Sequence, residues 1–173
     1  MEDRIQKAVE LFKSGYNCSQ SVVAAFADMY GFTQEQALRM SASFGGGIGR
    51  MRETCGAACG MFLVAGLETG ATEATDREGK AANYAVVQEL AAEFKKRNGS
   101  LICGELLGLK KKSRSPLFRK SVLLNIIASV PVQKWLKKRQ EFGRNISKSI
   151  QNELLKCFLL QNGKKCSIKC YIT

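Results

Sequence analysis

Hydrophobic side chains recur every three or four positions along the first 109 residues, which is the spacing of one face of an α-helix. The pattern predicts a helix that ends at Gly15 and a second helix that runs from about Ser19 to Tyr30. Thr33 and Gln36 form a capping box, which predicts that a third helix starts there. Because no segment alternates as a strand does, we expect an all-α protein, a compact bundle of about five or six helices.

Three further helices are predicted after residue 54. Residues 54–70 are mostly small and apolar, which is typical of a buried helix packed close to a neighbouring backbone. Thr75 and Glu78 form a second capping box, before a long helix that ends at Gly99. Residues 100–108 form a short last helix that Ser100 caps. We expect these residues on the inner faces of the third helix and of the long helix: Leu38, Met40, Phe44, Ala81, Ala82, Tyr84, Ala85, Val87, Leu90, Ala91 and Phe94.

Charge divides the chain at Leu109. The formal net charge is +12, but residues 1–109 carry −2 and residues 110–173 carry +14. We therefore expect two domains: a helical domain over residues 1–109, and a divergent, poorly packed basic tail over residues 110–173. The chain has no histidine, which excludes Ser-His-Asp and Cys-His catalysis and any His-ligated metal.

The N-terminal residues are charged and amphipathic, unlike a secretory signal, and no apolar run reaches the length of a membrane span. We expect a cytoplasmic protein with no membrane partner. In that compartment thiols stay reduced, so the seven cysteines favour metal or redox chemistry over structural disulfides.

Cys18, Cys55 and Cys103 each lie at or near the start of a predicted helix. Free N–H groups and the helix dipole stabilise anions there, which lowers a thiol pKa and suits both a redox thiolate and a metal ligand. The alternative is that each is a small buried core residue. Cys59 is a weaker candidate, because its spacing from Cys55 puts their Cβ atoms about 5–6 Å apart, whereas a disulfide needs about 3.5–4.5 Å.

A glycine-rich loop precedes Cys55. Its spacing does not match a dinucleotide fingerprint, and no strand precedes it. The first interpretation is a tight turn. The second is a nest of N–H groups near the Cys55 centre, in which Gly46, Gly47 and Gly49 help to bind the cofactor and Arg50 and Arg52 balance negative charge.

The stretches YNCSQSV, FGGGIGRMRETCGAACG and GSLICGELLG resemble the C_GCAxxG_C_C family of redox-active proteins over residues 4–109. The resemblance implies an all-helical fold whose four family cysteines gather at one redox or metal centre, such as an iron–sulfur cluster. Three of the four correspond to Cys18, Cys55 and Cys103, which are thereby both the redox candidates and the metal-ligand candidates. Cys59 occupies a variable position of the motif.

The fourth family cysteine has no counterpart between Cys103 and Cys157. The Lys110–Lys112 run is what a slip-prone A tract would encode, and another reading frame of the tail contains a cysteine between Ser129 and Val130. We therefore hypothesise that the tail is a frame-shift product. We expect Glu53, or a tail cysteine such as Cys157, to substitute for the missing fourth ligand.

The expected function is a redox-active thiol or iron–sulfur protein that transfers electrons or exchanges disulfides, with an unidentified redox partner and a homodimer as one possible assembly. Whether it is an enzyme is left open. The alternative is a non-catalytic interaction module with core cysteines, whose tail binds polyanions. Its basic residues would be Lys134, Lys137, Lys138 and Arg139. No nucleic-acid motif is present, so we do not expect a nucleic-acid partner.

Overall fold

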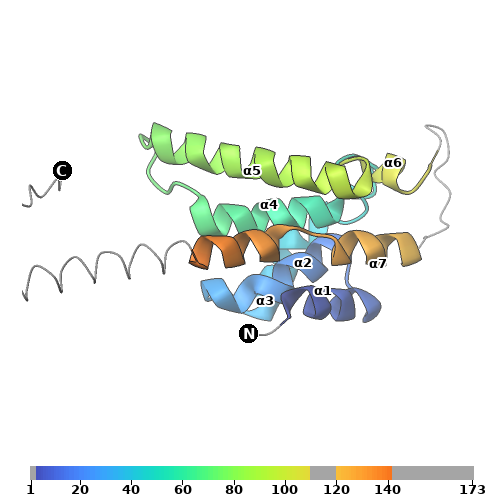
Figure 1. Cartoon of the computed structure of the whole chain (residues 1–173). Helices are drawn as coiled ribbons and strands as arrows, with labels where there is room; N and C mark the ends of the chain where they lie inside the picture. Colours follow the sequence, from blue (N-terminus) through green and yellow to red (C-terminus); the bar gives the residue numbers. More distant parts are fainter. Residues whose placement is uncertain (1–2, 110–119, 142–173) are drawn as a thin grey trace, which may run out of the picture. The chain divides into compact units, whose positions relative to one another are not determined.

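The computed structural model describes residues 3–109 and 120–141 (Figure 1). Within them there is no strand, and an isolated antiparallel bridge joins Thr54 to Ile102. The predicted all-α fold is therefore confirmed. The helices are α1 (Arg4–Lys13), α2 (Cys18–Phe26), η1 (Ala27–Tyr30), α3 (Gln34–Ser41), η2 (Ala42–Phe44), α4 (Gly56–Thr69), α5 (Arg77–Asn98), α6 (Cys103–Leu106) and α7 (Lys120–Ala128). In the described residues, no helix combines the length and the apolar character that crossing a bilayer requires.

The chain divides into two compact units, residues 1–133 and residues 134–173. In the first unit α2 is the central helix: it packs against α1, α3 and α4, and α4 in turn packs against α5 (Figure 1). Eight of the nine residues of α2 are buried. Glycine permits the close approach of α4, because a Cβ built on Gly60 would lie 2.9 Å from the Cβ of Val22. This agrees with the prediction for residues 54–70.

Side-chain caps fix the start of several helices. The Thr33–Gln36 capping box is present at α3, as predicted. At α5 the cap is Asp76, whose carboxylate accepts a hydrogen bond from Gly79 N–H at 2.7 Å, so the predicted cap at Thr75 is wrong by one residue. Asp76 prevails because a carboxylate is also stabilised by the positive end of the helix dipole.

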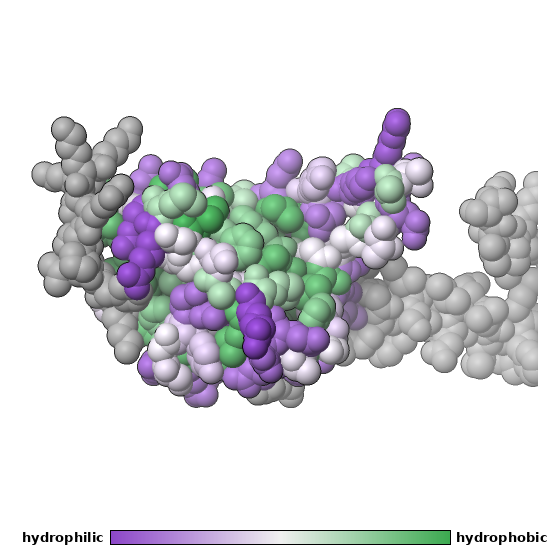
Figure 2. Space-filling model, turned by 180° about the vertical axis from the view of Figure 1, so that it is seen from behind, coloured by the Kyte–Doolittle hydropathy of each residue, from purple (hydrophilic) through white to green (hydrophobic). Residues whose placement is uncertain are grey.

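Fewer residues of α3 and α5 are buried than the sequence predicts. Tyr84 is 63% exposed and Met40 is 38% exposed, and in α5 only Leu90 and Phe94 are buried. The reason is that α5 lies at the edge of the bundle with α4 as its main neighbour, so only one stripe is covered (Figure 1). Figure 2 shows hydrophobic and hydrophilic residues interspersed on the face opposite to that of Figure 1.

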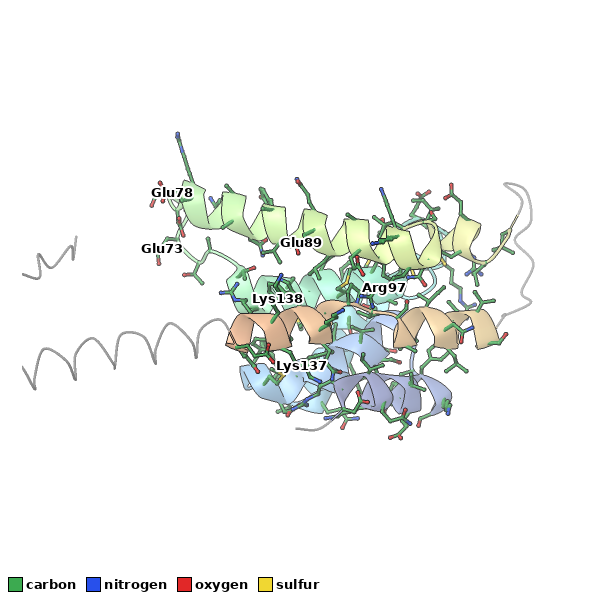
Figure 3. The ribbon with its side chains drawn as sticks, viewed as in Figure 1. Glu73, Glu78, Glu89, Arg97, Lys137 and Lys138 are labelled. Atoms are coloured by element: carbon green, nitrogen blue, oxygen red, sulfur yellow. The ribbon has the colours of Figure 1, made fainter. Side chains whose placement is uncertain are left out.

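Charges at the ends of α5 follow its dipole. Glu73 and Glu78 lie in the loop before the helix and in its first turn, while basic residues occupy its last turn (Figure 3). Arg97 forms an ion pair with Glu93 at 2.7 Å and donates a hydrogen bond to the carbonyl oxygen of Ser129 at 3.3 Å. This bond links the end of α5 to the residue after α7.

Helix α7 packs against α1 within the first unit and buries Leu123, Ile126 and Ile127. The N–H of Ile5 donates to the side-chain oxygen of Gln133 at 2.8 Å. The predicted domain boundary at Leu109 stays a prediction.

Residues 132–141 are helical, and in the second unit Arg139 lies 5.6 Å from the ring centroid of Trp135. Lys134, Lys137 and Lys138 are exposed there. The tail cysteines Cys157, Cys166 and Cys170 lie outside the described residues.

Candidate functional site

Cys18, Cys55 and Cys103 occupy the predicted positions at helix starts. Cys18 is the first residue of α2, Cys55 is the N-cap of α4, and Cys103 is the first residue of α6. Cys59 lies one turn into α4. All four are free thiols and are buried, with exposed fractions between 1% for Cys55 and 8% for Cys59.

The bridge between Thr54 and Ile102 joins the elements that carry two of these thiols. The N–H of Cys55 donates to the carbonyl oxygen of Leu101 at 2.7 Å, and the N–H of Cys103 donates to that of Glu53, also at 2.7 Å. These bonds hold the start of α6 beside the start of α4. Residues far apart in the sequence are thereby brought to one place.

Cys18 reaches the same place through a close contact between α2 and α4. A Cβ built on Gly56 would lie 3.4 Å from the Cβ of Cys18, and the charges of Cys55 and Cys103 act on the Cys18 thiol. The charge of Cys103 also acts on Cys55 and on Cys59. We call Cys18, Cys55, Cys59 and Cys103 the thiol cluster.

The expected lowering of the thiol pKa values is not found. Burial, reinforced by the neighbouring thiolates, raises the pKa of Cys18 to about 12. Burial raises the pKa of Cys55 to about 11, although the N–H groups of Ala57 and Ala58 donate to its sulfur and oppose the shift. The helix N-termini do act in the predicted direction, but the loss of water outweighs them.

Cys103 differs from the other thiols because an arginine reaches it. Burial raises the pKa of Cys103 too, but the Arg52 side chain donates a hydrogen bond to the sulfur and its charge opposes the shift. At Cys59 burial also raises the pKa, and its sulfur lies 3.8 Å from the carbonyl oxygen of Thr54. Cys103 is therefore the thiol whose surroundings include a cation.

The glycine-rich loop forms a left-handed turn over the thiol cluster. Residues 46–50 and 52 all have positive φ, and three of these residues are not glycine: Ile48 at 56°, Arg50 at 64° and Arg52 at 68°. Such a conformation costs roughly 1–2 kcal/mol for each residue that carries a Cβ. Strain of this kind is kept where the surrounding structure enforces it, as at functional sites.

The first interpretation of this loop, a tight turn, agrees with the structure, and the cofactor-binding nest stays a prediction. The turn is closed by hydrogen bonds such as Arg50 N–H to the carbonyl oxygen of Gly45 at 3.1 Å. It also supplies one donor to the thiol cluster, since Gly46 N–H donates to the sulfur of Cys18. Gly47 packs against Cys103, whereas Gly49 and Arg50 are exposed.

Asn17 is a positioning residue that the sequence analysis did not single out. Its side-chain oxygen accepts hydrogen bonds from the N–H groups of Ser19 and Gln20, both at 3.0 Å, and its amide donates to the carbonyl oxygen of Ala42 at 2.9 Å. It thus caps α2 directly before Cys18. The signal was present, because Asn followed three residues later by Gln is a capping-box pattern.

The predicted metal-ligand set was tested against this geometry. Thiolates are the ligands that iron–sulfur clusters use, so the donor type fits. In residues 3–109 and 120–141, however, no three His, Cys, Asp or Glu side chains are arranged to hold a metal ion. Glu53 is exposed, and it is its backbone oxygen that contacts the start of α6; Cys157 lies outside the described residues. As they lie, the thiols do not form a metal site.

A family model described as "Putative redox-active protein (C_GCAxxG_C_C)" matches residues 16–129. The chain belongs to this family. The match contains the whole thiol cluster and the helices from α2 to α7, and it leaves residues 130–173 unmatched. Membership in the C_GCAxxG_C_C family supports a general redox role for the cluster. Neither the curated proteins nor the solved structures include a match to this chain.

Proposed function

We propose that this chain is a thiol-based redox protein that exchanges disulfides through Cys103 and Cys55. The observation that carries the proposal is the convergence of four buried thiols from three helix starts, with an arginine at Cys103. A thiolate beside a cation is the usual attacking group in disulfide exchange.

The proposed step uses a small organic disulfide as oxidant. The Cys103 thiolate attacks one sulfur of the substrate, whose S–S bond breaks and releases one thiolate. The Cys55 thiolate then attacks the Cys103 sulfur, which forms the Cys55–Cys103 disulfide and releases the second thiolate. Two electrons pass to the substrate, and the two thiol protons leave with the released thiols.

The pairing of Cys103 with Cys55 is supported by the backbone bonds that hold the starts of α4 and α6 together. Cys59 is less suited as the partner of Cys55, because the two lie one turn apart on the same helix. Since all four thiols are buried, the small substrate reaches them during local opening of the loop at residues 45–52.

The test is peptide mapping of the reduced protein after anaerobic treatment with hydroxyethyl disulfide. Wild type is expected to form the Cys55–Cys103 disulfide. C55S is expected to stop at the mixed disulfide on Cys103, and C103S is expected to form neither. C59S is the matched control from the same cluster and should behave as wild type. Peptides that contain Cys157, Cys166 and Cys170 are scored separately.

If all four cluster thiols remain free in wild type, disulfide exchange is refuted. The alternative function is then favoured, an interaction module with core cysteines, whose polyanion binding would fall steeply with salt. The iron–sulfur cluster also stays a prediction. Iron and sulfide analysis of anaerobically purified protein tests it, because a bound cluster gives a coloured, iron-containing protein.

A further inference from the structure

Two arginines of the glycine-rich loop have the same backbone conformation but different surroundings. Arg50 has φ 64° and Arg52 has φ 68°. Arg50 is exposed, whereas Arg52 is half-buried and its side chain donates a hydrogen bond to the sulfur of Cys103. The two residues therefore differ in what the side chain contacts and not in the backbone that carries it.

The backbone on both sides of this contact is fixed. The carbonyl oxygen of Arg52 accepts a hydrogen bond from Gly104 N–H at 3.0 Å, and that of Glu53 accepts one from Cys103 N–H at 2.7 Å. A Cβ built on Gly104 would lie 3.5 Å from the Cβ of Arg52, an ordinary van der Waals distance, so residues 52 and 104 lie side by side. The two hydrogen bonds hold residue 52 beside the start of α6, next to Cys103.

The other thiols of the cluster have neutral partners. Backbone N–H groups donate to the sulfurs of Cys18 and Cys55, and the sulfur of Cys59 lies beside the carbonyl oxygen of Thr54. In the described part of the chain, Arg52 is the cation that contacts a cluster thiol. Charge-assisted hydrogen bonds are about twice as strong as neutral ones, so this contact distinguishes one sulfur from three.

We propose that Arg52 selects Cys103 as the thiol that attacks first, by donating a charge-assisted hydrogen bond to its sulfur. The inference rests on the proposed function, to which it adds the residue that determines the order of reaction. Without this contact we expect Cys59, the most exposed of the four thiols, to react first.

The experiment measures alkylation of fully reduced protein by iodoacetamide, resolved for each cysteine by mass spectrometry. In wild type, Cys103 is expected to react before Cys59 although it is the less exposed of the two. In R52Q, the rate of Cys103 relative to Cys59 should fall about tenfold, as expected for the loss of one charge-assisted hydrogen bond, so that the order reverses. R52K should restore part of the preference, because lysine keeps the charge but not the guanidinium geometry.

R50Q is the matched control, since it removes the same charge two residues away at a similar positive φ. It should leave the Cys103 to Cys59 ratio unchanged. Three results would overturn the proposal: Cys59 reacting first in wild type, an equal fall in R50Q and R52Q, or no recovery in R52K. Alkylation needs no disulfide, so these outcomes are independent of whether the Cys55–Cys103 disulfide forms.

Discussion

Gly47 makes the tightest backbone contact with the thiol cluster. A Cβ built on it would lie 2.6 Å from the Cβ of Cys103 and 2.9 Å from the carbonyl oxygen of Glu53, and its φ is 76°. Glycine is therefore required there both for its conformation and for the absence of a side chain. The loop can pack directly against the start of α6 only because residue 47 has no side chain.

We predict that G47A destabilises the fold far more than G49A does. Both positions have positive φ, so each substitution costs roughly 1–2 kcal/mol through the backbone. The nearest atom to a Cβ on Gly49 is 4.0 Å away, so G49A adds no steric clash. G47A should cost about 2 kcal/mol more through overpacking. Urea unfolding of reduced protein measures the difference, and equal losses in the two variants would contradict the proposed contact.

Single residues also show where the sequence suffices for the site and where it does not. The positions of Cys18, Cys55 and Cys103 at helix starts are predictable, because caps and glycines are local signals. The direction of their pKa shifts is not, because it depends on burial by segments distant in the chain. The contact of Arg52 with Cys103 is equally non-local. Both arginines belong to the same glycine-rich loop, and the pairing of residues 54 and 102 is what brings Arg52 beside Cys103.

At the scale of elements, ion pairs and hydrogen bonds to Asp28 join α1 to η1. Arg4 donates hydrogen bonds to both carboxylate oxygens of Asp28, at 2.5 and 2.8 Å, and Lys7 lies 3.5 Å from the same carboxylate. Arg4 also donates to the carbonyl oxygen of Ala25 at 2.9 Å. The hydrogen bonds from Arg4 lower the pKa of Asp28 to about 2.

We predict that D28N lowers the free energy of unfolding at neutral pH by at most about 1 kcal/mol, because the carboxylate is more than half exposed and solvent screens the pair. A lowered folded-state pKa gives stability that is present above the ordinary value of 3.8 and is lost as the pH falls through about 2. The difference between wild type and D28N should therefore disappear between pH 4 and pH 2 in urea titrations.

E35Q is the control for this measurement, since it removes a carboxylate from the exposed pair of Glu35 with Arg39 on α3. Its effect should be smaller than that of D28N, because one exposed ion pair within a helix contributes only a few tenths of a kcal/mol. An equal or larger loss in E35Q would contradict a special contribution from the Arg4–Asp28 contact.

The helices themselves are predictable from local patterns, but their faces are not. The ends at Gly31 and Gly99 and the cap at Thr33 follow from nearby residues alone. Tyr84 and Met40 were expected inside because they share a helix face with buried residues, yet whether such a face is covered depends on the number of neighbouring helices. Helix α5 has one main neighbour, so an apolar pattern there overestimates burial.

At the scale of the whole molecule, the family match runs through Ser129 and the first compact unit through Gln133, both past the Lys110–Lys112 run. The reading-frame hypothesis covers residues 110–173, which include residues that the family model matches, and it stays a prediction. We predict that genes of close relatives encode, near the position between Ser129 and Val130, a cysteine followed by an amphipathic helix. Nucleotide sequencing checks this. An intact frame in those relatives that encodes the same basic tail would contradict it.

The bridge between Thr54 and Ile102 also has a consequence for the timing of synthesis. Cys18 and Cys55 leave the ribosome well before Cys103, and the bridge that brings Cys55 and Cys103 together forms only after α4 and α5 have folded back on each other. Closing so long a loop is slow compared with forming its helices. We therefore expect the thiol cluster to form late in the folding of the first unit, so that Cys18 and Cys55 remain without Cys103 during that interval.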